Sequence, residues 1–250
     1  MRPRVLVEAS RVELVLFLRD PVTLVFALAL PVLFVVVMGA VFGDQPDPSG
    51  EFYGGVGGST YYTPAYIGLA AASVGLISVP TQLAGYRENG VLRRMRASGL
   101  PASAVVVAQL VVGLGLATAG ALVVTVVSFL ANDVERPDDL LGVAAAFVLG
   151  SVAMILLGVA LGALLPTARA AQGAGVLIWF VLIFVGGAGP PPEALPHAMD
   201  VLGSLTPMRP LVRALQGPWY AGGWEALDLL GLLAVALVGW ALAAWRLRRD

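Results

Sequence analysis

The sequence contains no cysteine, no lysine and only one histidine among its 250 residues. Without cysteine it can form neither a disulfide nor a thiolate metal centre, and a single histidine does not make a metal site by itself. Without lysine it cannot form a P-loop, because that nucleotide-binding motif needs a lysine to reach the phosphates. The composition therefore excludes these metal and nucleotide sites from the chain.

Charged residues are also scarce. They make up 12% of the chain, whereas 58% of its residues are hydrophobic, and the mean hydropathy is +0.87. Soluble domains carry about 25% charged residues, so this composition is that of an integral membrane protein. The charges gather in short stretches between long apolar runs, and this segregation predicts an all-α membrane fold.

Six apolar segments are long enough to cross a membrane, because a bilayer core needs about 20 helical residues. We read these spans as free of ionisable side chains at membrane depth and treat residues 1–250 as a single transmembrane domain. The fifth span is the shortest. The predicted bounds are Val22–Phe42, Tyr61–Gly85, Ala102–Ala131, Leu140–Leu165, Gly173–Gly187 and Ala226–Trp245.

The distribution of arginine predicts the orientation of these spans. Six spans put both termini on one side, and that side holds twelve arginines: four before the first span, four between the second and third, Arg169, and three after the last. The other side holds three, which are Arg136, Arg209 and Arg213. Because basic residues concentrate on the cytoplasmic side of membrane proteins, we expect both termini in the cytoplasm.

The first twenty residues precede the first span. In RVLVEASRVELVLFLRD, from Arg4 to Asp20, one helical face carries Arg4, Glu8, Arg11 and Arg19, and Leu, Val and Phe cover the rest. Such a helix lies in the membrane interface. We expect an interfacial elbow helix over residues 1–20 that turns into the first span at Asp20 and Pro21; the alternative is one continuous bent helix.

The stretch YRENGVLRRMRASGLPASA, Tyr86 to Ala104, lies between two apolar spans. Gly90, Gly99 and Pro101 bracket a short helical segment whose arginines would each cost about 2.5 to 3.5 kcal/mol in lipid. This segment is therefore expected to be a short cytoplasmic helix. Charge alone is equally compatible with a simple topology anchor.

Three separated motifs resemble the permease subunits of type 2 ATP-binding cassette exporters, of the daunorubicin-resistance-like kind. The first is YRENGVLRRMRASGLP, the second is LRDPVTL with Pro31 and the VFG at Val41–Gly43, and the third is LPHAMDVLGSLTPMRPLVRALQG, Leu195–Gly217. The third departs from the family pattern, because TPMRP at Thr206–Pro210 replaces the usual Pro-Leu-Thr-Tyr. Together with six spans, these motifs cover nearly the whole chain.

The resemblance implies that the helix between the second and third spans, in the loop 86–100, couples the membrane helices to a separate ATPase subunit. That partner would carry ATP and magnesium, and this chain would be a non-catalytic permease with no cofactor of its own. Apolar Val91, Leu92 and Met95 among the arginines would suit such docking. The residues expected to take part in coupling are Arg87, Glu88, Gly90, Val91, Leu92, Arg93, Arg94, Met95, Arg96 and Leu100.

By the same resemblance, two permease copies, expected to be identical rather than different, enclose an apolar path lined by their second and fifth spans. The expected path residues are Tyr66, Leu69, Ser73, Trp179, Phe180 and Phe184, although for any one of them packing in the core or against lipid is the simpler explanation. Residues 189–221 are expected to form short outer helices as a lid. Gly158 and Gly162 form a GxxxG motif that predicts close helix packing within the chain.

The predicted function is the membrane subunit of an exporter that moves a hydrophobic or amphipathic compound, such as a drug, antibiotic or lipid, across a bacterial plasma membrane. A permease for a glycolipid or polysaccharide is the same-fold alternative. A secondary carrier or channel is disfavoured because ion coupling needs ionisable groups at membrane depth. An intramembrane hydrolase is disfavoured because neither Ser73 nor Ser151 has a basic partner in the predicted spans.

Overall fold

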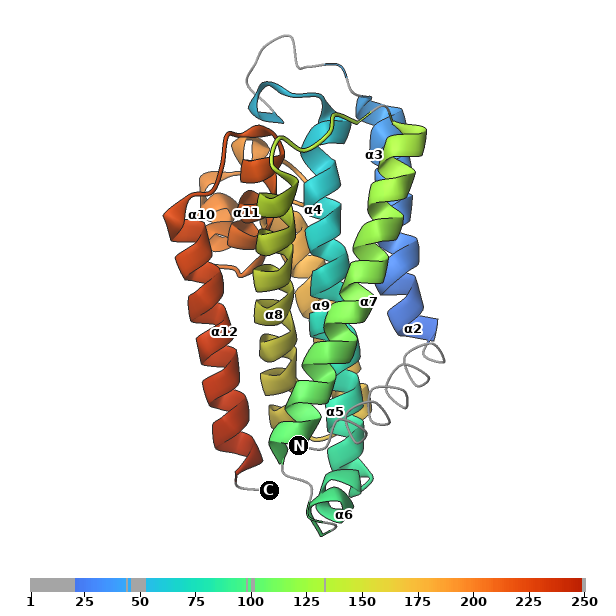
Figure 1. The fold of residues 1–250 in the computed structure, drawn as a ribbon, viewed down its shortest axis with the longest axis vertical. Coiled ribbons are helices and arrows are strands. Elements are labelled where there is room, and N and C mark those ends of the chain that lie inside the picture. Colours follow the sequence, from blue (N-terminus) through green and yellow to red (C-terminus); the bar gives the residue numbers. More distant parts are fainter. Residues whose placement is uncertain are drawn as a thin grey trace.

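In a computed structural model, the structure describes residues 21–43, 45, 53–97, 99, 102–132 and 134–248. All regular elements of this part are helical, and they form an elongated bundle (Figure 1). The helices are α2 (Pro21–Leu24), α3 (Leu30–Phe42), α4 (Gly58–Ser73), α5 (Val79–Glu88), α6 (Val91–Ala97), α7 (Ala102–Ala131), α8 (Leu140–Leu164), α9 (Ala168–Val185), α10 (His197–Ser204), α11 (Met208–Tyr220) and α12 (Ala226–Leu247).

The six predicted spans are confirmed as six helices that are long and apolar enough to cross a membrane. A π-helical turn, η1 (Val25–Ala29), joins α2 to α3, and another, η3 (Val74–Ser78), joins α4 to α5, so each pair forms one continuous helical span. The predicted elbow helix over residues 1–20 lies outside the described residues, as does Leu100.

Several predicted boundaries differ from the helix ends, and two of these differences involve polar residues. The second span does not end at Gly85 but continues as helix to Glu88, and the fifth begins at Ala168 rather than Gly173. Polar residues suggested a loop at both places. The structure gives those polar groups partners at the ends of neighbouring helices, so the helices extend beyond their apolar portions.

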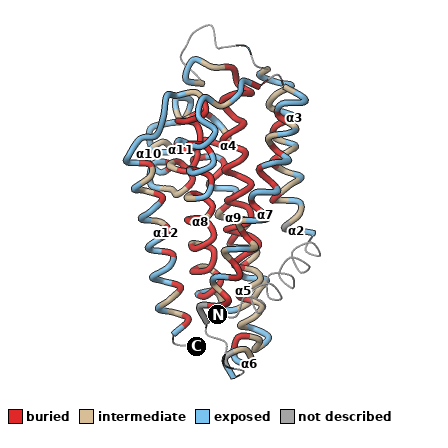
Figure 2. The backbone as a smooth tube through the Cα atoms, in the orientation of Figure 1, coloured by how far each residue is buried: buried red, intermediate tan, exposed pale blue. Residues whose placement is uncertain are grey.

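The centre of the bundle is the span made by α4, η3 and α5, together with α8 (Figure 2). Here helices approach closely because glycine has no side chain. A Cβ placed on Gly158 would lie 1.7 Å from the carbonyl oxygen of Gly75, and one on Gly175 would lie 2.0 Å from that of Leu76. Gly162 abuts the backbone of Pro80 in the same way. The predicted close packing at the GxxxG motif is therefore present, between helices of one chain.

The segment expected to be a lid contains the 3-10 turn η4 (Pro192–Ala194), α10 and α11. Helix α11 is largely buried because it wedges between α4, α8 and α12. Gly150 provides the space for Leu211, since a Cβ there would lie 2.1 Å from the Leu211 Cδ1 atom. Helix α11 is thus part of the packed bundle, while α10 is mostly exposed.

Candidate coupling junction and apolar path

Helix α6 lies at one end of the bundle, on the same side as the end of α12, while α10 and α11 lie toward the other (Figure 1). We name these the α6 end and the α11 end. Helix α5 ends at Glu88 with Asn89 as its C-cap, and Gly90 follows with a φ of +67°, a left-handed conformation that glycine adopts readily at helix ends. This sharp stop separates the charged stretch into the last turn of α5 and the separate helix α6.

The last two residues of α5 contact the turn between α8 and α9. The Arg87 Nη1 atom donates hydrogen bonds to the carbonyl oxygens of Gly162, at 3.2 Å, and Leu165, at 2.9 Å. The Glu88 Oε2 atom accepts a hydrogen bond from the Ala168 amide at 2.9 Å. We call this set of contacts the α5 clasp.

The charges of the α5 clasp match the helix ends that they contact. Helices leave unpaired carbonyls and partial negative charge at their C-termini, and unpaired amides and partial positive charge at their N-termini. Arg87 meets the C-terminus of α8, and Glu88 meets the N-terminus of α9, where Thr167 also accepts a hydrogen bond from the Ala170 amide. The clasp therefore ties the base of α6 to two further spans.

Helix α6 presents two kinds of surface. Arg93 and Arg94 are exposed, and neither forms a hydrogen bond or ion pair with any residue in the described part of the chain. Leu92 is only 7% exposed, and Met95 packs against the hydrophobic core. Val91 and Gly90 are half-buried, and Arg96 lies in the last turn. A seven-residue helix is unstable alone, so it packs its apolar side on its own chain.

This arrangement differs from the sequence-based expectation in one respect. The apolar residues of α6 were expected to meet a partner, but Leu92 is buried within this chain. Among the described side chains of α6, the accessible surface includes those of Arg93 and Arg94.

The expected path residues fall into two groups. Tyr66, Leu69, Ser73 and Trp179 are buried within the chain, whereas Phe180 is 43% exposed and Phe184 59% exposed. The Trp179 Nε1 atom donates a hydrogen bond to the Ser73 hydroxyl at 2.7 Å, and that hydroxyl donates to the Leu69 carbonyl at 2.8 Å. The first group thus fixes α4 against α9, and the second faces outward.

Phe180 and Phe184 line an apolar hollow of about 390 Å³ between α3 and α9. Phe34, Met38 and Tyr62 form much of its other wall. Tyr66 lies behind this wall, with its ring stacked on those of Tyr62 and Phe34 at centroid distances of 5.6 and 5.8 Å. Within the described residues, the Tyr66 hydroxyl is buried without a hydrogen-bond partner.

The α11 end contains a buried arginine that the sequence analysis did not single out. Arg209 is 3% exposed; its Nη1 atom donates to Asp200 at 2.7 Å, and its Nη2 atom donates to the Val185 carbonyl at 2.9 Å. The guanidinium group lowers the pKa of the Asp200 carboxyl by hydrogen bonding. Arg209 thus caps the C-terminus of α9 and links α10 to α11.

A spacing signal for this contact was present. Arg209 belongs to the TPMRP motif, the place where the chain departs from the family pattern, and Asp200 precedes Arg209 by nine residues. The reading of all six spans as free of ionisable side chains was wrong for the sixth, because Asp228 is buried in the first turn of α12. Among the described residues, no group of three or more His, Cys, Asp and Glu residues could hold a metal ion.

Comparison with known families gives one result that covers most of the chain. The family model described as ABC-2 type transporter matches residues 6–219. No curated protein matches the chain. The matched range includes the α5 clasp, α6, the aromatic hollow and almost all of α11.

Proposed function

The chain belongs to the ABC-2 type transporter family, and from that premise we propose that it is the membrane-spanning subunit of an ATP-driven exporter. The family consists of multi-pass permeases that pair with an ATP-binding cassette ATPase. In our proposal the ATPase is a separate chain, and the cargo is a hydrophobic or amphipathic compound that leaves a bacterial cell. The daunorubicin-resistance-like subtype is part of this proposal.

The observation that carries the proposal is the exposed arginine pair on α6. Two guanidinium groups without partners in the described chain are suited to carboxylates on another protein, because arginine forms directed, charge-assisted hydrogen bonds. Arginine is also enriched in protein interfaces. The α6 end, with Arg93 and Arg94, is therefore the proposed ATPase-docking surface.

The α5 clasp supplies a physical route for motion from that surface. Displacement of α6 would act directly on α5, and through Arg87 and Glu88 on the ends of α8 and α9. Helix α9 carries Phe180 and Phe184, which line the hollow. We propose that docking forces reach the cargo path in this way, with Arg87 and Glu88 as positioning residues rather than ATPase contacts.

In our proposal, the hollow beside Phe180 and Phe184 is the part of the cargo path that this chain forms. Its aromatic and aliphatic walls suit flat or apolar compounds. A second permease copy, identical in our proposal, would complete it. The distribution of arginines supports an orientation with both termini and the α6 end in the cytoplasm.

The proposal is tested with a double variant, Arg93→Ala with Arg94→Ala, co-expressed with an ATPase subunit that co-purifies with the original protein. We expect normal membrane expression and normal thermal stability, together with loss of ATP-dependent efflux for a panel of amphipathic fluorescent dyes. The matched control is Arg213→Ala, which removes an exposed arginine at the α11 end. Unchanged efflux in the double variant, or equal loss in both variants, contradicts the proposal.

A further inference from the structure

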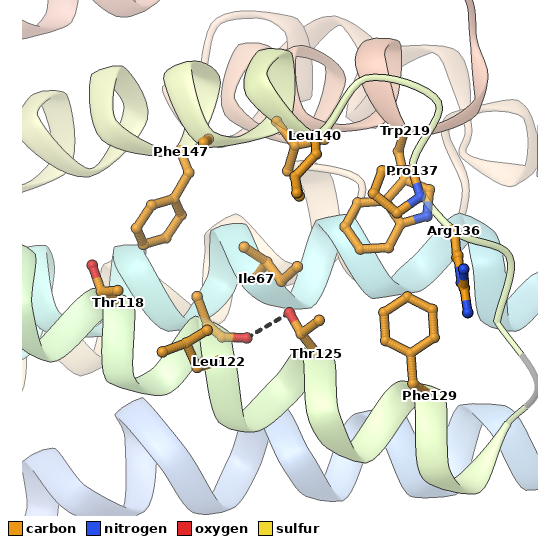
Figure 3. Close-up of a pocket in the computed structure, with 13 residues that line it drawn as sticks. Ile67, Thr118, Leu122, Thr125, Phe129, Arg136, Pro137, Leu140, Phe147 and Trp219 are labelled. Atoms are coloured by element: carbon orange, nitrogen blue, oxygen red, sulfur yellow. Dashed lines mark hydrogen bonds between the residues drawn. The ribbon is translucent and has the colours of Figure 1, made fainter.

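A second and larger hollow, which we name the α7–α8 groove, lies between α4, α7 and α8 (Figure 3). Its volume is about 790 Å³, within the range of about 300–1,000 Å³ typical of small-molecule sites. It shares no lining residue with the hollow beside Phe180 and Phe184. The groove is thus separate from the proposed cargo path.

The inner part of the groove is lined by apolar side chains. Leu122 of α7, Phe147 of α8 and Ile67 of α4 line this part, and Phe129 of α7 lies farther along, toward Trp219 (Figure 3). The Thr118 and Thr125 hydroxyls donate hydrogen bonds to the Leu114 and Ala121 carbonyls, each at 2.7 Å. Because these donors are already used within α7, the wall is suited to an acyl chain rather than to a polar ligand.

One end of the groove carries a cation. Arg136 lies beside Phe129 and Trp219 at this end, and it is exposed without a hydrogen bond or ion pair to the described residues (Figure 3). The adjacent backbone is fixed, because the Glu135 amide donates to Thr60 at 3.1 Å and the Glu135 carbonyl accepts from Trp219 at 3.1 Å. The backbone beside Arg136 is therefore held in place by α4 and α11.

Acidic side chains flank this cation. Glu135 and Asp138 are exposed on either side of Arg136 in the sequence, while Asp139 accepts a hydrogen bond from the Gly142 amide. A purely anionic head group would be attracted by one charge and repelled by the others. A head group with both a phosphate and an ammonium group matches both signs.

We propose that the α7–α8 groove binds one zwitterionic phospholipid, with phosphatidylethanolamine as the preferred head group. One acyl chain lies along Leu122, Ile67 and Phe147, the phosphate pairs with Arg136, and the ammonium group pairs with Glu135 or Asp138. The bound lipid fills the space that α7 and α8 leave open and so stabilises their packing. This role does not depend on which compound the exporter carries.

The test uses the purified full-length protein, delipidated and then titrated with phosphatidylethanolamine or phosphatidylglycerol of the same acyl chains. Native mass spectrometry counts the lipids bound. We expect one saturable phosphatidylethanolamine, bound about tenfold more tightly than phosphatidylglycerol. Arg136→Ala should weaken its binding about tenfold, whereas Arg213→Ala, an exposed arginine outside the groove, should not change it.

A second variant separates head-group recognition from folding. Glu135→Gln with Asp138→Asn keeps Arg136 and the backbone contacts, so we expect retained phosphate binding and a shift of preference toward phosphatidylglycerol. Leu122→Trp should block the groove for both lipids. Equal binding of the two lipids by the original protein, non-saturable binding, or occupation of the groove by a second copy of the chain would each overturn the proposal.

Discussion

The two ends of the bundle both place arginine at helix termini, but they treat its charge differently. At the α11 end, Arg209 is buried and its charge is matched by Asp200 and the Val185 carbonyl. At the α6 end, Arg87 is joined to the C-terminus of α8, while Arg93 and Arg94 remain exposed without partners in the described chain. The buried Arg209 is paired within its own chain, whereas the exposed pair on α6 leaves positive charge for another molecule.

The span between the two ends is rigid where glycines allow backbones to touch. The close approach of Gly158 to the carbonyl of Gly75, and of Gly175 to that of Leu76, joins α8 and α9 to the central π-helical turn. Packed elements of this kind have few ways to deform continuously. A displacement at the α6 end is therefore expected to move whole helices.

The largest expected effect is a loss of stability in this rigid centre, which connects the two ends of the bundle. Gly158→Ala places a methyl group against the Gly75 carbonyl, so we expect a loss of about 3 kcal/mol or more in stability, at the upper range for overpacking. Thermal unfolding of the purified protein measures it. Gly115→Ala is the matched control, because nothing lies within 4 Å of that position; its stability should be unchanged or raised by about 0.5–1 kcal/mol.

The second prediction tests whether the buried Arg209 at the α11 end stabilises the fold. Arg209→Ala removes a charge-assisted hydrogen bond to Val185 and leaves a cavity, so we expect a loss of about 1.5–3 kcal/mol. Arg213→Ala, on an exposed position of the same helix, should stay within about 0.5 kcal/mol. Equal unfolding temperatures for the two variants would show that the buried Arg209 stabilises the fold no more than the exposed Arg213.

The third prediction separates two roles at the α6 end. Arg87→Ala breaks the contact with α8, so it should lower stability by about 1 kcal/mol, whereas Arg94→Ala should change stability by less than about 0.5 kcal/mol. Both should reduce efflux. If Arg87→Ala is as stable as Arg94→Ala by thermal unfolding, the clasp does not bear on the packing of the spans.

The smallest expected effect is a pH dependence at the α11 end. The pKa of Asp200 is lowered by Arg209, so its contribution to stability is fully present above the unfolded value of about 3.9 and is lost as pH falls through the lower folded value. Asp200→Asn should thus unfold at a lower temperature than the original protein at pH 6, with a smaller difference at pH 3. A difference that does not change with pH would assign the stabilisation to something other than this carboxylate.

The sequence alone predicted much of this organisation. Hydropathy located all six membrane helices because apolar length is a direct consequence of bilayer thickness. Its errors lay where polar groups have tertiary partners: helix α5 continues through Arg87 and Glu88, and α9 begins at Ala168, because the α5 clasp satisfies both helix ends. Such contacts join residues about 80 positions apart, so no local pattern reveals them.

The candidate path was only partly predictable for a related reason. Composition identified the aromatic residues of the second and fifth spans, but not which way each side chain faces. Trp179 is buried because it hydrogen-bonds Ser73, while its neighbour Phe180 faces the hollow. The α7–α8 groove was not anticipated, since it depends on how α4, α7, α8 and the loop that carries Arg136 come together.

The most direct test of the central claim is site-specific photo-crosslinking in active membranes that contain the ATPase. A photoreactive amino acid replaces Arg94 at the α6 end in one variant and the exposed Leu205 at the α11 end in another. Our account predicts a crosslink to the ATPase from position 94 and none from position 205. A crosslink from position 205 without one from position 94 would contradict it.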